Sequence, residues 1–258
     1  MNPLGALFSR NSWNVFRRDF VAWQKYAASS ITINIFDPIA YFLALGFGLG
    51  AYLTLGAKGS LLQFMAPGIV GVAALNAATF DACWGAYERL NNNGVYESMV
   101  TAPVDPLEIA AGEYLWQGFR ALLYGAIVLA VIAVFGLVHS WWALLSLPLL
   151  ALAGVVFAMP AFAVAMMVKT QEHLFYYFSF VATPMVMIGG VFFPLDRVPH
   201  WLLTIAWLTP LYHAVIIFRA LVLGTLHVGL LGNLAWLLIA MALFVWLPVP
   251  FLRNKLAR

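Results

Sequence analysis

The side chains that could do acid–base, nucleophilic or metal chemistry are few in this sequence and lie far apart. No two of the five histidines stand at a spacing that would bring both to one metal ion on one helix. The single cysteine, Cys83, leaves no partner for a disulfide or for a metal-binding pair. None of the four lysines ends a GxxxxGK[ST] phosphate-binding loop, which excludes an ATPase of that class. The sequence therefore predicts no catalytic residue, no metal site and no cofactor in this chain.

Ionisable groups inside apolar segments are the remaining candidates for chemistry, because a charge in lipid is costly unless it is paired or used. Asp37, Asp81 and Arg120 are such groups, and we expect all three near the inner ends of their segments. We favour the interpretation that they pair or reach the interface. The alternative is a polar gate at the inner mouth of a transport pathway. We expect no acid at mid-membrane depth, which is unfavourable for a proton-coupled transporter.

The elements that position these groups are membrane helices. Of the 258 residues, 64% are hydrophobic and 9% are charged, whereas a soluble domain has roughly 45–50% and 25%. The sequence predicts an all-α polytopic membrane protein, a single domain over residues 1–258. Six apolar runs reach the ~20 residues that cross a bilayer core, and these are Ser30–Tyr52, Leu61–Tyr87, Leu115–Val138, Trp141–Val168, Leu174–Phe193 and Leu230–Leu252.

A seventh apolar segment, Val198–Leu223, is interrupted by prolines, histidines and an arginine. With six spans, nine of the 13 lysines and arginines lie on the side of the termini and three on the other, which marks the terminal side as cytoplasmic. A seventh span would nearly remove this bias. We therefore expect cytoplasmic termini and an outer re-entrant or surface-lying helical hairpin over residues 195–228, with a true seventh span as the alternative. The residues that characterise the hairpin are Pro194, Asp196, Arg197, Pro210 and His213.

Residues 9–27 predict an amphipathic helix ahead of the first span. Its large aromatic residues recur at spacings that place them on one helical face, and they are Trp13, Phe16, Phe20 and Trp23. Its basic residues fall largely on the rest of the surface. This pattern is typical of a helix in the cytoplasmic headgroup layer, in contact with membrane lipid.

Residues 88–112 form a long polar segment between the second and third spans, and a loop of this length is usually functional. Val95–Thr101 predicts two helical turns that end before Pro103. Asp105, Pro106 and Glu108 then predict the N-cap, first and third positions of the next helix. A short helix between two polar turns can dock on a partner, and a solvated loop is the alternative.

Four sequence blocks resemble the type-2 ATP-binding-cassette (ABC) exporter permeases, most of all the NodJ-like subfamily that exports nodulation factors. The blocks are FDPIAYFLALGFGLG at 36–50, PGI at 67–69, ESMVTAP at 97–103 with Glu108-Ile109 and Gly112-Glu113, and FFPLDRVP at 192–199 with LTPLYH at 208–213 and Arg219-Ala220. The resemblance runs over essentially the whole chain.

This resemblance implies a half-transporter in the bacterial inner membrane. Two copies of the chain would pair, and each would seat on a separate ABC ATP-binding subunit that binds ATP and Mg²⁺. The polar loop would hold the coupling helix, whose contact residues would be Glu88, Arg89, Val95, Tyr96, Glu97, Met99, Val100 and Pro103. The substrate path would lie between the copies, bordered by spans one, two and five, where Tyr176 and Tyr177 would either line the path or form an aromatic belt at the membrane interface.

We therefore expect the permease subunit of an ATP-driven exporter for an amphipathic substrate, such as a lipo-oligosaccharide, a lipid-linked glycan or a hydrophobic small molecule. No nucleic-acid partner is expected. One alternative is a secondary transporter driven by an ion gradient. A more distant one is a membrane-embedded lipid-modifying enzyme, for which Asp196, His200 and His213 would have to converge.

Overall fold

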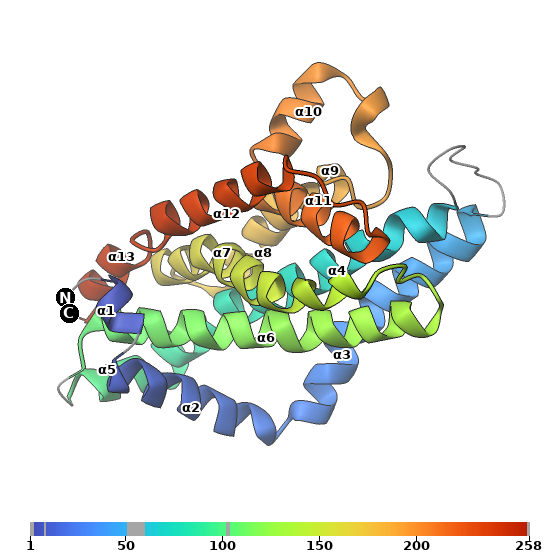
Figure 1. The fold of residues 1–258 in the computed structure, drawn as a ribbon. Coiled ribbons are helices and arrows are strands. Elements are labelled where there is room, and N and C mark those ends of the chain that lie inside the picture. Colours follow the sequence, from blue (N-terminus) through green and yellow to red (C-terminus); the bar gives the residue numbers. More distant parts are fainter. Residues whose placement is uncertain (1–2, 8, 51–59, 102–103, 257–258) are drawn as a thin grey trace.

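Helices make up most of the part of the chain that the computed structural model describes, which is residues 3–7, 9–50, 60–101 and 104–256 (Figure 1). No strand occurs in these ranges. Five helices are long and apolar enough to cross a membrane, and a sixth crossing results if one bent helix pair counts as a span. The expected all-α polytopic membrane fold is confirmed.

The long helices agree with five of the six predicted spans. They are α3 (Ala27–Leu43) with a π-helical turn at Ala44–Leu49, α4 (Leu61–Phe80) with π-helical turns at Asp81–Gly85 and Glu88–Asn92, α6 (Pro106–Val134), α7 (Ser146–Met167) after a 3₁₀ turn at Trp141–Leu145, and α12 (Leu230–Phe244) followed by α13 (Val249–Leu256). The polar segment predicted over 88–112 is shorter than expected, because helices occupy both of its ends. What remains between them is α5 (Val95–Val100).

The fifth predicted span is shorter than expected. It consists of α8 (Leu174–Tyr177), a π-helical turn (Phe178–Ala182) and α9 (Thr183–Ile188), and a 3₁₀ turn at Gln171–His173 precedes it. Gly189 and Gly190 end it, and Gly190 has a φ of +72° that favours glycine. Residues 174–188 extend about 22 Å at 1.5 Å per residue, which is less than the ~30 Å of a hydrocarbon core.

The outer hairpin is a bent pair of helices. A 3₁₀ turn (Leu195–Arg197) leads to α10 (His200–Trp207), and α11 (Pro210–Leu223) follows at an angle of 86°. α11 is inserted among α4, α7 and α12, with most of its side chains buried, whereas α10 projects from the bundle (Figure 1). α11 ends at Gly224, which lies against Ser140 in the turn before α7. The segment is therefore broken at its prolines, as expected, and its re-entrant course stays a prediction beside the alternative of one broken span.

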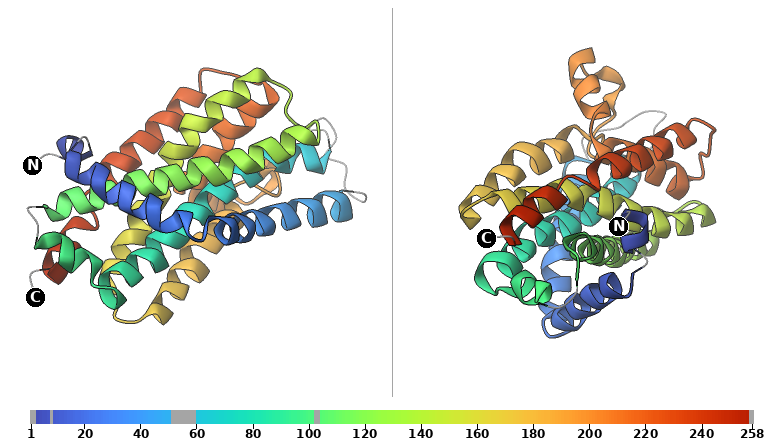
Figure 2. Two further views of the ribbon diagram at one scale, coloured as in Figure 1. Left: turned by 90° about the horizontal axis from the view of Figure 1, so that it is seen from below. Right: turned by 90° about the vertical axis from the view of Figure 1, so that its left-hand side faces the viewer.

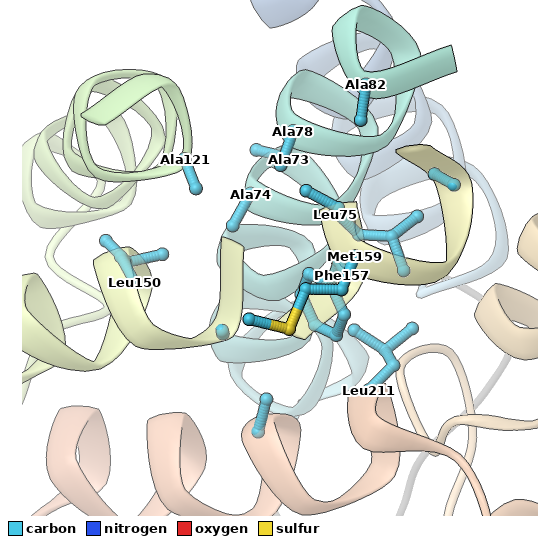
Figure 3. Packing of buried hydrophobic residues seen from close by; sticks show 14 of the residues in the cluster. Ala73, Ala74, Leu75, Ala78, Ala82, Ala121, Leu150, Phe157, Met159 and Leu211 are labelled. Carbon is cyan, nitrogen blue, oxygen red and sulfur yellow. The ribbon is translucent and has the colours of Figure 1, made fainter. Parts of the chain in front are cut away.

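α4 forms the centre of the bundle and is buried along most of its length. Its small side chains allow close approach of neighbouring helices, the usual way in which membrane helices pack. Figure 3 shows Ala74 and Ala78 of α4 in the same hydrophobic cluster as Phe157 of α7 and Leu211 of α11. A second close approach joins α7 and α6, where a Cβ atom on Gly154 would lie 2.2 Å from the Cβ of Ala121.

Both termini and α5 lie at one end of the bundle, and α3 and α6 end at the other (Figures 1 and 2). The remaining helices are α1 (Pro3–Leu7) and α2 (Arg10–Gln24), and α2 packs along α6 from its first turn to Tyr124. The predicted helix over 9–27 is therefore present. Its position in the lipid headgroup layer stays a prediction.

Candidate functional site

Six charged side chains and one tyrosine meet where α2, α4, α5 and α6 come together, at the end of the bundle that holds the termini. We call this set the charge cluster, and it consists of Arg18, Asp19, Asp81, Arg89, Tyr96, Glu113 and Arg120. Its three carboxylates are nearly inaccessible to solvent. Buried charges are tolerated when each has an opposite charge and hydrogen bonds nearby. Because the paired groups come from different helices, the pairs hold these four helices in fixed positions relative to one another.

Arg89 occupies the centre of the charge cluster. Its Nη2 atom lies 2.7 Å from Oε2 of Glu113 and 3.1 Å from Oδ2 of Asp81, and its Nη1 atom lies 3.8 Å from Oδ1 of Asp19. One guanidinium therefore contacts carboxylates from α6, from the extension of α4 and from α2. The planar guanidinium, with five N–H donors, is suited to such multiple contacts.

Asp81 and Arg120 pair with each other inside the bundle. Arg120 is the fifteenth of the 29 residues of α6 and so lies at its middle, not near an end of its span as expected. Arg120 Nη1 lies 3.7 Å from Asp81 Oδ1, and Arg120 Nε donates to the carbonyl of Ala77 at 3.1 Å. Asp81 Oδ2 also accepts hydrogen bonds from Gln117 Nε2 at 2.7 Å and from Trp116 Nε1 at 3.1 Å. The favoured interpretation was that all three intramembrane groups pair or reach the interface, and pairing is found for Asp81 and Arg120.

Tyr96 connects α5 to the charge cluster. Its hydroxyl donates to Glu113 Oε1 at 2.7 Å and accepts from Arg89 Nε at 3.2 Å, and its side chain is fully buried. Burial, and next the negative charge of Glu113, raise the pKa of Tyr96 far above its ordinary value. The hydroxyl therefore stays protonated and remains a donor.

Two of the expected partner contacts require correction, because they face the interior. Tyr96 cannot anchor α5 in a partner's groove from its buried position, and Arg89 is likewise inside the charge cluster rather than at a rim. A two-turn helix presents few side chains to each side, and here the hydrogen bond to Glu113 turns the tyrosine inward. Glu97 is exposed on the outer side of α5.

The other predicted contact residues lie in several environments. Met99 is half-buried against the core, Val95 is half-buried, and Glu88 accepts a hydrogen bond from Gln171 in the turn before α8. Val100 ends α5. Pro103 lies outside the described residues.

α2 joins the charge cluster through Arg18 and Asp19. The two pair with each other, and Arg18 also lies 3.5 Å from Glu113. Burial, followed by the nearby charge of Glu113, raises the pKa of Asp19 to about 7, although Arg89 and Arg18 act in the opposite direction. The charge of Asp19 therefore changes near neutral pH.

Gly112 allows α2 to approach α6 closely. A Cβ atom at Gly112 would lie 2.5 Å from Val15 Cβ and 2.7 Å from the Ser12 carbonyl oxygen. Ser12 Oγ donates to the backbone carbonyl of Glu108 at 2.9 Å. Beside this contact, Asp105 caps α6 and forms the expected capping box with Glu108.

A cavity of about 440 Å³ opens on the side of the bundle between α3, α4 and residues 174–188. These are the predicted spans one, two and five. Its polar lining consists of Asn34, Asp37, Asn76 and Thr183, and its aromatic lining consists of Tyr41, Phe80, Trp84, Phe175, Phe178 and Phe192.

The sequence suggested that Asp37 lies near the inner end of its span, but the structure places it elsewhere. It is the eleventh residue of the 22-residue helix Ala27–Gly48 and thus lies near its middle. Asp37 is thus an acid near the middle of a helix long enough to cross a membrane, which was not expected from the sequence. Asp81 and Arg120 do not line the cavity.

The two tyrosines predicted to border the path do not line the cavity. Tyr176 is exposed on the outside of the bundle, and Tyr177 is buried in the core. Phe175 and Phe178, their neighbours on the other faces of the helix, line the cavity instead.

The outer hairpin is fixed at its bend by His213, which is buried. Its Nδ1 atom lies 2.8 Å from Asn233 Oδ1 and its Nε2 atom lies 2.7 Å from the Trp207 carbonyl oxygen. Pro194 and Asp196 line a second cavity near the start of the hairpin. Pro210 begins α11 and Arg197 ends the preceding 3₁₀ turn. The described part of the chain brings no three histidine, cysteine or acidic side chains together in a way that could hold a metal ion.

Three members of the charge cluster were not assigned a role from the sequence, Arg18, Asp19 and Glu113. Asp19 lies on the face of α2 that also carries the buried Ser12, Val15 and Trp23. The sequence signal for Asp19 is its spacing, which places this acid on the same helical face as the buried residues. No local pattern showed that Glu113 contacts Tyr96.

Comparison with known proteins places the chain in one family. The family pattern of the ABC-2 type transporter matches residues 10–223. Nodulation protein J of Rhizobium leguminosarum bv. viciae is 32% identical over 97% of this chain and 93% of that protein. Nodulation protein J of Bradyrhizobium diazoefficiens is 34% identical over 86% and 88%. Inner membrane transport permease YadH of Escherichia coli is 27% identical over 90% and 92%. The chain belongs to the ABC-2 type transporter family and is the membrane permease of an ABC exporter, not an enzyme.

Proposed function

We propose that two copies of this permease assemble with two ATP-binding subunits in a bacterial inner membrane and export an amphipathic substrate. In this arrangement the termini and α5 lie at the cytoplasmic face, and ATP and Mg²⁺ bind only to the partner subunits. The similarity to YadH, which is named an inner membrane transport permease, supports the location.

The observation that carries the proposal is the buried link from α5 to the spans. α5 lies at the end of the bundle with both termini, and Tyr96 joins it to Glu113 of α6 and to Arg89 beyond α4. Because the link is buried and charge-assisted, a displacement of α5 would carry the inner ends of both helices with it.

α4 extends this link to the cavity. Asp81 and Arg89, in the helical turns that continue α4, belong to the charge cluster. Ile69, Val72 and Asn76 of the same helix line the cavity. A movement at the inner end of α4 therefore reaches the cavity wall along one continuous helix, which is a physical route from ATP-driven closure to substrate movement.

The surface offered to the ATPase would be the outer side of α5. Glu97, Ser98 and Thr101 are exposed there. With Tyr96 turned inward, docking depends on this polar face and on the half-buried Met99. The amphipathic nature of the substrate is supported by the aromatic cavity wall with a few polar side chains.

Copurification with the ATP-binding subunit tests this proposal. The permease in nanodiscs should bind the subunit and change its rate of ATP hydrolysis. Ser98→Trp, which places a bulky side chain on the exposed face of α5, should weaken this binding at least tenfold. Thr225→Trp, at an exposed position beyond α11, is the control and should bind like wild type. Equal binding by both variants, or hydrolysis that never responds to the permease, would refute the proposal.

A further inference from the structure

The cavity between α3, α4 and residues 174–188 contains one carboxylate and no basic side chain. Asp37 is its only charged lining residue among those the structure describes, and Asn34, Asn76 and Thr183 are its neutral polar ones. Aromatic rings make up much of the remaining wall. The cavity as a whole therefore carries negative charge when Asp37 is ionised.

Among the residues that the structure describes, none pairs with Asp37. No hydrogen bond or ion pair reaches its carboxylate from any described residue. Asn34, one turn before it on the same face, donates its amide to the carbonyl of Ser30 at 2.8 Å. By contrast, Asp81 in α4's extension has two arginines and two further donors. The fold thus pairs Asp81 with positive charges and leaves the Asp37 carboxylate available to a ligand.

The depth of Asp37 increases the effect of its charge. It lies at the middle of the helix Ala27–Gly48, about 15 Å from either end at 1.5 Å per residue. An ionisable group at that depth normally faces a cavity and a partner of opposite charge. Where lipid and a bound ligand exclude water from the cavity, the low dielectric strengthens the attraction of this exposed carboxylate for a cation compared with the same pair in water.

The aromatic wall favours the same kind of ligand. Trp84 packs against Phe80, Phe175 and Phe178, with ring centroids between 4.7 and 5.0 Å apart. These rings present apolar surface, and their faces attract cations that lack a tight hydration shell. A small hydrated metal ion would gain little from such a wall.

We propose that this cavity binds lipophilic organic cations, molecules with an apolar or aromatic body and one positive charge on nitrogen or phosphorus. The charge pairs with the Asp37 carboxylate, and the body lies against Trp84 and the neighbouring phenylalanines. This inference rests on the proposed function, since it defines one class of substrate for the proposed exporter.

Equilibrium dialysis with the permease alone, in nanodiscs of uncharged lipid, tests the site. The probes are tetraphenylphosphonium and its neutral analogue triphenylphosphine oxide. We expect wild type to bind the cation at least tenfold more tightly than the neutral compound. Asp37→Asn should weaken cation binding at least tenfold and change binding of the neutral compound less than twofold. Asp37→Glu, which keeps the charge, should retain most of the cation affinity.

The control variant is Asp105→Asn, which removes a carboxylate outside the cavity and keeps a good N-cap. It should bind both probes like wild type. Equal affinity of wild type for the cation and the neutral compound would overturn the proposal even if Asp37→Asn failed to fold. Displacement of the cation by millimolar sodium would overturn it as well, because the site would then select small ions. Since no ATPase is present, these results are independent of the copurification test.

Discussion

Tyr96 and Glu113 lie 17 residues apart and are joined by a buried hydrogen bond of 2.7 Å from the tyrosine hydroxyl to Oε1. The bond attaches a six-residue helix at one end of the bundle to a helix long enough to cross a membrane. A surface helix held only by its flanking loops could move independently of the spans. Here α5 and α6 are held by a charge-assisted contact, which is stronger than a neutral hydrogen bond.

The close approach of α2 to α6 should depend on Gly112. Gly112→Ala places a methyl group against Val15 and the Ser12 backbone, and overpacking of this kind costs about 1–3 kcal/mol. We expect a lower melting temperature and faster proteolysis within α2. Gly232→Ala is the control, because its Cβ would meet no atom within 4 Å. If both variants melt alike, α2 is not tightly docked.

Glu113 should be far more important for stability than a surface acid. Glu113→Gln leaves Arg89 without its 2.7 Å partner in a buried site, and breaking a buried pair costs about 3–5 kcal/mol. Arg253→Gln removes an exposed pair with Asp105, which is worth about 0–1 kcal/mol. Thermal unfolding in detergent compares the two. A similar small effect of both variants would show that the charge cluster contributes little.

Asp19 should make the stability of α2 docking depend on pH. Its folded pKa of about 7 lies above its ordinary value of 3.8, so the folded state holds a proton that the unfolded chain releases. The stabilisation is therefore complete below pH 4, declines as the pH rises to about 7 and is then constant. Melting temperatures from pH 4 to pH 8 should show this slope in wild type and lose it in Asp19→Asn. An unchanged slope in the variant would assign the dependence to another group.

Cysteine labelling should locate the two ends of the bundle on opposite sides of the membrane. In a Cys83→Ala background, we expect His227→Cys to react with an impermeant reagent from outside the cell. Asn92→Cys, at the end of α4's extension next to α5, should react only from the cytoplasm. Labelling of both positions from the same side would contradict the proposed orientation.

The structural features that the sequence predicted correctly depend on residues close together in the chain. The start of α6 followed from Asp105, Pro106 and Glu108, since a capping box is a local interaction. The broken hairpin likewise followed from Pro210 and its neighbours. The fifth span was drawn too long because hydropathy continues beyond Gly189 and Gly190, where the backbone turns.

The residues that were misplaced depend on contacts between distant segments. The side chain of Tyr96 points inward because of Glu113, and six residues of helix carry too little periodicity to show which side is buried. Asp37 was placed too near the inner end because the span was drawn from Ser30, whereas the helix begins at Ala27. The partners of Asp81 come from α6 and from the helical turn that contains Arg89, and only the folded chain brings them together.

The most direct test of coupling is whether ATP changes access to the cavity through Tyr96. A cysteine at Asn76, in the cavity wall, reports access to an impermeant thiol reagent in proteoliposomes that contain the permease and its ATPase. We predict that ATP changes the labelling rate several-fold in the wild-type background and in the control Ser98→Ala. Tyr96→Phe, which removes only the hydroxyl, should still bind the ATPase and hydrolyse ATP but show no ATP-dependent change in labelling. An ATP response in Tyr96→Phe equal to that of wild type would contradict the account.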